Sequence, residues 1–203
     1  FIDAVYRGAE AQGLPVETMI SEYAQGQFEL TLRHGSALRA ADDLAMLKRL
    51  IRALAVRHGM MACFMAKPFA GRAGSGMHVH ASLADAAGNN LFSDHDEALA
   101  PLLKQAVAGL LETMHESMLV FAPHFNSWRR FSAQSYAPTT PTWGTNNRSV
   151  AVRIPAGSPA GRHLEQRAAG IDSNPYLVGA TVLAGMRKGI LAKADPGPET
   201  TAY

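Results

Sequence analysis

The residues from Lys67 to Ser82 combine a lysine–proline turn, a glycine-rich loop and a short His-x-His segment. Glycine lacks a Cβ atom and tolerates positive φ, so such a loop lets the backbone approach a ligand closely. His78 and His80 are two residues apart, which on a β-strand places both imidazoles on one face. The pattern predicts a metal–nucleotide site. The alternative is a glycine-rich turn before a strand with two surface histidines, because short motifs also arise by chance.

Three glutamates could add carboxylate ligands to such a site. Glu22 and Glu29 flank Gly26, and if this turn folds two strands together, the two carboxylates lie on one face. They then repel each other unless a cation lies between them. With Glu165 and His78 they suit Mg²⁺ or Mn²⁺ better than structural Zn²⁺, which favours thiolates or more histidines. Alternatively, Glu22 and Glu29 are two solvated surface residues.

Arginines cluster in the second half of a chain that has few charges elsewhere. Arginine is always charged and binds phosphate and carboxylate through two parallel hydrogen bonds. Phosphoryl transfer needs metal ions on the phosphates and cations near the developing charge. Each arginine could instead be an ordinary surface residue, but the cluster favours an anion site. Its members are Arg129, Arg130, Arg148, Arg153, Arg162 and Arg167.

The elements that must position these residues alternate between helices and strands. Apolar periodicity predicts helices over residues 2–12, about 41–59, about 96–119 and 175–191. Strands are predicted on both sides of Gly26, over 60–66, at the His-x-His segment, over 148–155 and from 164. The strands pair mainly as hairpins, so we expect an α+β fold with an antiparallel sheet and flanking helices. The long irregular segment 122–147 is expected to serve function.

The composition is that of a soluble globular protein. The 203 residues are 47% hydrophobic and 18% charged, and the net charge of +2 gives no support for nucleic-acid or anionic-membrane binding. No apolar run reaches the roughly 18 residues of a membrane span. The single cysteine excludes an internal disulfide and fits a reducing compartment. We therefore expect a cytoplasmic protein without nucleic-acid or membrane partners.

Several of these motifs occur together, and in the same order, in the glutamine synthetase family. Residues 67–82 resemble the family's ATP-binding signature, and residues 147–155 resemble its Asn-Arg-Ser/Thr-x-x-x-Arg-Ile-Pro strand. Segments 22–29, 126–130, 164–167 and 174–177 resemble further family motifs. The resemblance implies a catalytic domain of the glutamine synthetase/guanido kinase-like fold. It also implies an ATP-dependent ligase that joins the glutamate γ-carboxylate to an amine through γ-glutamyl phosphate.

The resemblance further implies a role for each matching residue. Glu22 and Glu29 would bind one Mg²⁺ or Mn²⁺ ion, and His78 and Glu165 would bind the other. The residues implied for ATP are His80, Ser82, Arg148 and Arg153. The residues implied for glutamate are Gly74, Arg130 and Arg167, of which Arg130 would hold the α-carboxylate. Arg130, Arg148 and Arg167 are the expected catalytic residues.

One departure from the family pattern concerns the amine. Ammonia-using members carry a glutamate directly after a tyrosine in this region, whereas here Tyr136 is followed by Ala137. Members that join glutamate to polyamines or other amines resemble the chain more closely in the following Pro-Thr and Trp-Gly pairs. Ala73 also stands where many members have an asparagine beside the glutamate. We expect a polyamine or other primary amine as the acceptor; the alternatives are a true glutamine synthetase and a non-catalytic relative.

The chain lacks parts that the resemblance implies. It starts without a methionine, and residues 1–203 would form only part of the catalytic domain. The small N-terminal β-domain, an upstream Glu-x-Glu strand and the C-terminal end are absent from it. Family members form active sites between subunits of a ring. We therefore expect a dodecamer-like homo-oligomer and an incomplete site in this chain alone.

Overall fold

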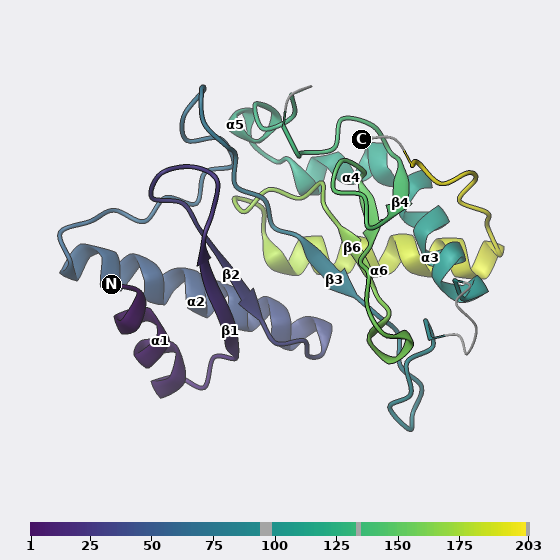
Figure 1. The fold of residues 1–203 in the computed structure, drawn as a ribbon, viewed down its shortest axis with the longest axis horizontal. Coiled ribbons are helices and arrows are strands. Elements are labelled where there is room, and N and C mark those ends of the chain that lie inside the picture. Colours follow the sequence, from purple (N-terminus) through teal and green to yellow (C-terminus); the bar gives the residue numbers. More distant parts are fainter. Residues whose placement is uncertain (94–98, 133–134, 202–203) are drawn as a thin grey trace. The chain divides into compact units, whose positions relative to one another are not determined.

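The computed structural model of the protein describes residues 1–93, 99–132 and 135–201. These residues form two compact units (Figure 1). The first contains Phe1–Phe64 and Pro68–Ala73, and the second contains Met65–Lys67 and Gly74–Tyr203. No helix within the described ranges is long and apolar enough to cross a membrane.

The first unit packs a β-hairpin against two helices. Its elements are α1 (Ile2–Ala11), β1 (Val16–Ser21), β2 (Phe28–Leu32) and α2 (Ala37–Arg57). Apolar side chains from both helices meet in its core, and Met19 and Leu30 of the hairpin pack against them. Helix α2 begins four residues before the predicted start at Ala41, because residues 37–40 are mainly good helix formers. The core residues are Val5, Ala9, Leu14, Leu47, Leu50 and Ile51.

The hairpin confirms the two strands predicted around Gly26. Its strands are antiparallel, and Gly26 has φ +75° in the turn, a conformation that glycine adopts without strain. Ile20 pairs with Glu29, and the backbone N–H of Glu22 donates to the carbonyl of Gln27. Glu22 and Glu29 therefore share the face of the hairpin that carries Ile20, while Met19 and Leu30 occupy the opposite face.

The second unit contains a four-stranded sheet. Its strand order is β3 (Val79–Ala81), β6 (Leu164–Gln166), β5 (Val152–Ile154) and β4 (Trp143–Thr145). The first two pairings are antiparallel, but β5 and β4 are parallel, so the sheet is mixed. The connection between them is only residues 146–151 and starts at Asn146, whose φ of 53° lies in the left-handed region that asparagine tolerates. Helices and sheets together confirm the α+β class.

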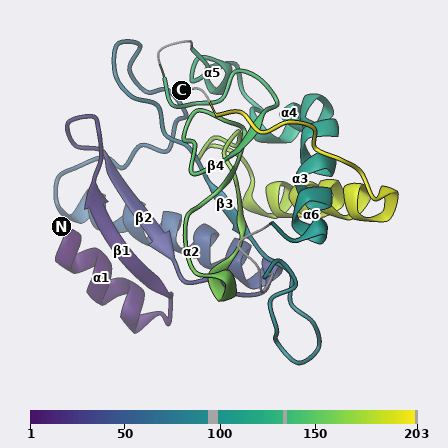
Figure 2. The ribbon, with the colours of Figure 1, turned by 45° about the vertical axis from the view of Figure 1, so that its right-hand side comes forward.

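The second unit also contains helices, two of which pack closely against each other. The helices are α3 (Pro101–Glu112), α4 (Met114–Phe121), the short α5 (Phe125–Trp128) and α6 (Pro175–Ala192), with a 3₁₀ turn η1 (Pro159–Gly161). Helices α3 and α6 lie side by side in both views (Figures 1 and 2). They touch through glycines: a Cβ atom on Gly109 would lie 2.1 Å from the carbonyl oxygen of Gly185 and 2.5 Å from the nitrogen of Gly189. Only glycine allows this approach.

Three sequence predictions need correction. The single helix predicted over 96–119 is two helices, because α3 ends before Thr113, whose side-chain hydroxyl donates a hydrogen bond to the carbonyl of Gly109. Residues 96–98 of that prediction lie outside the described residues. Residues 60–66 are not paired as a strand within the described chain, and Cys63 is exposed. Only Val152–Ile154 of the predicted strand 148–155 is regular, so Arg148 lies in a bend before it.

Asn174 caps α6 as predicted, accepting from the backbone N–H groups of Tyr176 and Leu177.

Candidate functional site

The sheet of the second unit carries a row of polar side chains on one face. His80 of β3 and Arg153 of β5 both pair with Glu165 of the intervening strand β6. Directly paired residues project to the same side of a sheet, so these three side chains form a row across three strands. His78 and Arg167 are each two residues from a member of the row and share its face. Because side chains alternate between the two faces of each short strand, four of the predicted site residues lie around Glu165.

Glu165 is the centre of this group and is only 2% exposed. Its Oε1 atom accepts a hydrogen bond from Arg167 Nη1 at 2.6 Å and lies 3.1 Å from His78 Nδ1. Its Oε2 atom accepts from Arg153 Nη1 at 2.9 Å. Burial alone would raise the pKa of Glu165, but the hydrogen bonds from His78 and Arg153 and the charge of Arg167 hold it well below its usual range. The carboxylate is therefore ionised at neutral pH.

The two arginines leave excess positive charge beside this carboxylate. Arg153 Nη2 also donates to Asn146 Oδ1, and Arg167 Nη2 donates to the carbonyl of Arg148, both at 2.9 Å. The Nε–H groups of Arg153 and Arg167 are buried and have no hydrogen-bond partner among the described residues. A buried donor without a partner is costly. Two guanidinium groups against one carboxylate thus favour an added anion, and phosphate oxygens are well suited to such donors.

The Glu165–His78 pair fits a hard divalent cation. Its two donor atoms, a carboxylate oxygen and an imidazole nitrogen, are 3.1 Å apart. Neighbouring ligands of an octahedral Mg²⁺ ion with bonds of about 2.0–2.1 Å are separated by about 3 Å. A cation that replaced the proton of this hydrogen bond would find two adjacent ligands here, and the donor set suits Mg²⁺ or Mn²⁺. Within the described residues, no three His, Cys, Asp or Glu side chains gather closely enough to hold an ion by themselves.

Glu22 and Glu29, the other two predicted ligands, belong to the first unit. They share one face of the β1–β2 hairpin, as the turn at Gly26 predicts. One Oε atom of Glu22 accepts a hydrogen bond from the backbone N–H of Tyr23 at 2.9 Å. The four predicted metal ligands thus form two pairs, one in each unit.

Arg130 is buried against the backbone that follows β6. It is 5% exposed, and its two terminal nitrogens donate to the carbonyls of Ala168 and Arg167 at 2.8 and 2.9 Å. Burial, and then the charge of Arg167, lowers the pKa of Arg130 to about 10, so the guanidinium remains protonated at neutral pH. Two loop glycines make room for this side chain. A Cβ atom on Gly74 would lie 3.0 Å from Arg130 Cγ, and one on Gly76 would lie 2.6 Å from Arg130 Nη2.

His80 extends the polar row on β3. Its ring lies 5.1 Å from the ring of His163, the residue before β6. Partial desolvation, opposed by the charge of Glu165, lowers the pKa of His80, which favours the neutral imidazole at physiological pH. Ser82 follows β3 by one residue and is exposed. In strand alternation it belongs to the same face as His80.

The segment that contains Ala137 lies next to Arg167. Arg167 Nη2 is 3.4 Å from the carbonyl oxygen of Tyr136, and the N–H of Ala137 donates to Ser135 Oγ. Arg148 is exposed, and its carbonyl also accepts from Arg167. The irregular segment predicted to serve function therefore contacts the polar face through its backbone.

Sequence reasoning did not single out Asn146 and His163, which contact Arg153 and His80. His163 could have been found from its spacing, since it is two residues before Glu165 on the same strand path. Asn146 carried only the weaker signal of an asparagine that tolerates a left-handed backbone.

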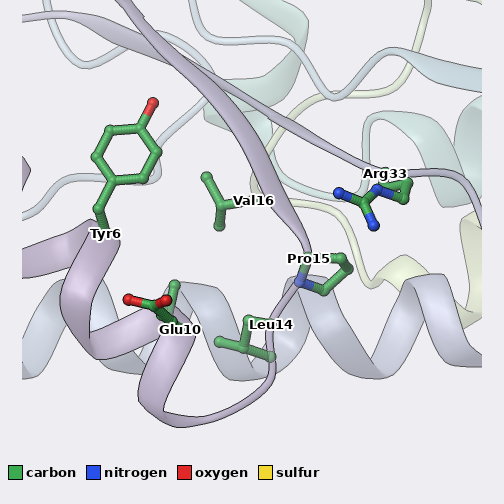
Figure 3. A pocket seen from close by; sticks show the side chains of 7 residues that line it. Tyr6, Glu10, Leu14, Pro15, Val16 and Arg33 are labelled. Carbon is green, nitrogen blue, oxygen red and sulfur yellow. The ribbon is translucent and has the colours of Figure 1, made fainter.

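A separate pocket of the first unit contains none of the predicted site residues (Figure 3). Tyr6 and Glu10 of α1 line it, together with Arg33, the residue directly after β2. Arg33 forms an exposed ion pair with Glu17 at 3.6 Å. Nothing in this pocket resembles the clustered charges around Glu165.

The fold and the site define an α+β protein whose sheet presents a carboxylate, imidazoles and guanidinium groups from one face. Such a face places anion-binding donors next to an ionised carboxylate. The sequence model of the family described as "Glutamine synthetase, catalytic domain" matches residues 1–202. The chain belongs to the glutamine synthetase family.

Characterised relatives include amine ligases. The gamma-glutamylputrescine synthetase PuuA of Escherichia coli (strain K12) is 46% identical over 183 residues, which are 90% of this chain and 39% of that protein. The glutamate–isopropylamine ligase of a Pseudomonas species is 37% identical, over 91% of this chain and 40% of that protein. A solved GmaS/ADP complex superimposes with a TM-score of 0.91 at 37% identity, covering 99% of this chain and 47% of that one. The chain therefore spans less than half the length of these relatives.

Proposed function

We propose that the full-length protein is an ATP-dependent ligase that joins the γ-carboxylate of glutamate to a primary amine. The observation that carries the proposal is the buried Glu165 carboxylate, held by Arg153, Arg167 and His78 on one face of the sheet. This arrangement supplies cation ligands and anion-binding donors within a few ångströms of each other. The names of the relatives PuuA and glutamate–isopropylamine ligase support the reaction class.

The chemistry would proceed in two steps. A γ-carboxylate oxygen of glutamate attacks the γ-phosphorus of ATP, which forms γ-glutamyl phosphate and releases ADP. The amine nitrogen then attacks the acyl carbon, inorganic phosphate leaves with the acyl C–O bond electrons, and the amine gives up a proton. Each step moves negative charge onto phosphate oxygens, where fixed cationic donors stabilise it.

The residues of the chain would divide this work as follows. Arg148 and Arg153 bind the phosphates of ATP, while His80 and Ser82 contact the nucleotide. Arg167 binds glutamate or the phosphoryl group in transfer, because its guanidinium contacts Glu165 and its Nε–H has no partner among the described residues.

Glutamate would be held by Arg130 and Gly74, which lie next to each other. Arg130 binds the α-carboxylate through the donors that its two backbone contacts leave available, and Gly74 lies beside the substrate. The pKa of Arg130, about 10, keeps the guanidinium charged for this purpose.

Mg²⁺ or Mn²⁺ would be held by two pairs of residues, His78 with Glu165 and Glu22 with Glu29. When bound, the ions neutralise phosphate charge and make the γ-phosphorus more electrophilic. The low pKa of Glu165 keeps its carboxylate ready to bind a cation without first losing a proton.

Ala137 is the feature that favours a carbon-bearing amine over ammonia. Ala137 directly follows Tyr136, whose carbonyl oxygen is 3.4 Å from Arg167 Nη2. A methyl group here leaves room for an alkyl chain and supplies no carboxylate to draw in ammonium. We therefore propose a polyamine or other primary amine as the acceptor.

Phosphate release by the full-length protein tests the proposal. With glutamate, ATP and Mg²⁺, turnover should depend on putrescine or isopropylamine and be much slower with ammonium alone. Rapid turnover with ammonium, but not with these amines, would identify a true glutamine synthetase instead. This second candidate is suggested by the glutamine synthetase of Clostridium saccharobutylicum, which is 37% identical. The variant Glu165→Ala should release no phosphate, even under conditions in which it remains folded and assembled. Undiminished function of this variant would favour a non-catalytic relative.

Two expectations from the family resemblance and one from the composition remain predictions. They are a ring-shaped, dodecamer-like homo-oligomer, a cytoplasmic location and a catalytic domain that extends beyond residues 1–203. Light scattering of the full-length protein after size-exclusion chromatography measures the first.

A further inference from the structure

We propose that Asp172 is a positioning residue for glutamate binding. It holds the turn that carries Arg130 in place, and its negative charge attracts the Arg130 guanidinium. The inference rests on the proposed function, in which Arg130 binds the α-carboxylate of glutamate. Asp172 lies outside every motif segment used to assign the site, and its hydrogen bond is to Ser127 rather than to any of the proposed metal or nucleotide ligands.

A chain of hydrogen bonds connects Asp172 to the turn that carries Arg130. Asp172 Oδ2 accepts from Ser127 Oγ at 2.6 Å, and this hydroxyl also accepts from the backbone N–H of His124 at 3.1 Å. The carbonyl of Ser127 in turn accepts from the backbone N–H of Arg130 at 3.1 Å. Ser127 is 1% exposed, so water does not compete for these bonds. Asp172 therefore fixes the turn three residues before the guanidinium-bearing residue.

The second carboxylate oxygen provides charge rather than a hydrogen bond. Asp172 Oδ1 is buried and has no hydrogen-bond partner among the described residues. The backbone leaves space for it, since a Cβ atom on Gly170 would lie 2.4 Å from this oxygen. Arg130 is itself buried, and the attraction of Asp172 opposes the lowering of its pKa by burial and by Arg167. The geometric link between the two residues is the hydrogen-bond chain through Ser127, and the charge of Asp172 adds a favourable electrostatic effect on the Arg130 guanidinium.

The geometry distinguishes this role from simple support of the fold. The neighbouring Ser173 already fastens this segment by donating from Oγ to the carbonyl of Phe121 at 2.9 Å. Gly170 adds a backbone bond to the same carbonyl, at 3.0 Å. The segment keeps these anchors without Asp172, so a substitution of Asp172 should leave the backbone of the segment in place. Arg130 donates to the carbonyls of Arg167 and Ala168, which fix its direction but bring no full negative charge.

Steady-state kinetics of the full-length protein test the inference with Asp172→Asn. Asparagine keeps the shape and an acceptor for Ser127 but removes the charge. We expect the KM for glutamate to rise about tenfold, while the KM for ATP and kcat stay within about twofold of the unmodified protein. Ser127→Ala is the matched control, because it removes the hydrogen bond and keeps the charge. It should raise the KM for glutamate less than Asp172→Asn does.

A double-variant cycle shows whether Asp172 acts through Arg130. In an Arg130→Lys background, Asp172→Asn should raise the KM for glutamate by clearly less than tenfold, because coupled residues are not additive. An unchanged glutamate KM in Asp172→Asn, equal increases for glutamate and ATP, or full additivity with Arg130→Lys would overturn the inference. These outcomes are read in a protein that releases phosphate with glutamate and ATP. If the unmodified protein releases none, it is the proposed function that fails.

Discussion

Glu165 is a buried, charged side chain with several polar contacts. It is buried, it is ionised, and it accepts hydrogen bonds from two arginines while touching a histidine. A buried ion pair adds little net stability compared with apolar packing, but removing one partner leaves an uncompensated charge. The group is therefore better explained by binding chemistry than by stabilisation of the fold.

The lowered pKa of Glu165 predicts a pH dependence of stability. A carboxylate whose folded pKa is depressed adds stability that is complete above its ordinary pKa of 4.5 and is lost as the pH falls toward the folded pKa. The free energy of unfolding should therefore decrease below about pH 4.5 in part through this group. In Glu165→Gln, which should lose about 3–5 kcal/mol at pH 7 because two arginines lose their partner, the decrease between pH 5 and pH 3 should be shallower. Urea unfolding at pH 7, 5, 4 and 3 measures both effects.

An exposed carboxylate provides the control for this experiment. Glu112 pairs with Lys188 at 2.8 Å, and both side chains are about half exposed. Exposed pairs contribute at most about 1 kcal/mol, so Glu112→Gln should leave the unfolding free energy and its pH dependence nearly unchanged. If Glu165→Gln kept the full acid dependence of the unmodified protein, the depressed pKa would be wrong.

At the scale of elements, the α3–α6 contact depends on residues without side chains. A Cβ atom on Gly189 would lie 2.0 Å from the carbonyl oxygen of Gln105 and 2.5 Å from the nitrogen of Gly109. These neighbours are backbone atoms, which cannot rotate away. The helices would have to separate, and the core between them would loosen.

Alanine substitutions in α6 should consequently have opposite effects at two glycines. Gly189→Ala should destabilise the protein by about 1–3 kcal/mol or more, because overpacking shifts the helices apart. Gly179 lies in the same helix, and a Cβ atom added to it would meet nothing within 4 Å, so Gly179→Ala should stabilise by about 0.5–1 kcal/mol through helix propensity alone. Thermal unfolding of both variants checks the sign. A neutral Gly189→Ala would contradict the close helix contact.

Sequence patterns predicted most elements and the gathering of the site, for identifiable reasons. Strand alternation correctly placed His78 and His80 on one face, and the cap at Asn174 correctly marked the start of α6. Local patterns could not reveal that Arg153 and Glu165 pair across two strands, because that register is set by packing between distant segments. They also missed the break at Thr113, since apolar periodicity continues through it. The hydrogen bond between Asp172 and Ser127 was missed as well, because the two residues are 45 positions apart in the sequence.

At the scale of the whole molecule, the chain folds as two units with separate cores. Leu47 is 2% exposed in the core of the first unit, while the core of the second forms around its sheet and helices. Leu47→Ala should cost about 2–5 kcal/mol of packing in the first unit. Amide hydrogen exchange should then lose protection in α1 and α2 more than in α3 and α6. Equal loss throughout would mean that the two units unfold as a single cooperative structure.

The short strand β6 has a consequence for how this protein can change during evolution. All three residues of the strand are buried, but Glu165 projects to the polar face while its neighbours Leu164 and Gln166 project to the opposite one. Deleting one residue just before the strand would exchange these orientations, bringing the carboxylate among apolar side chains and carrying Arg167 with it. The backbone ladder could survive such a deletion, but the anion-binding groups would be lost together. Point substitutions can tune this chemistry by degrees, whereas a change in chain length at β6 removes it in one step.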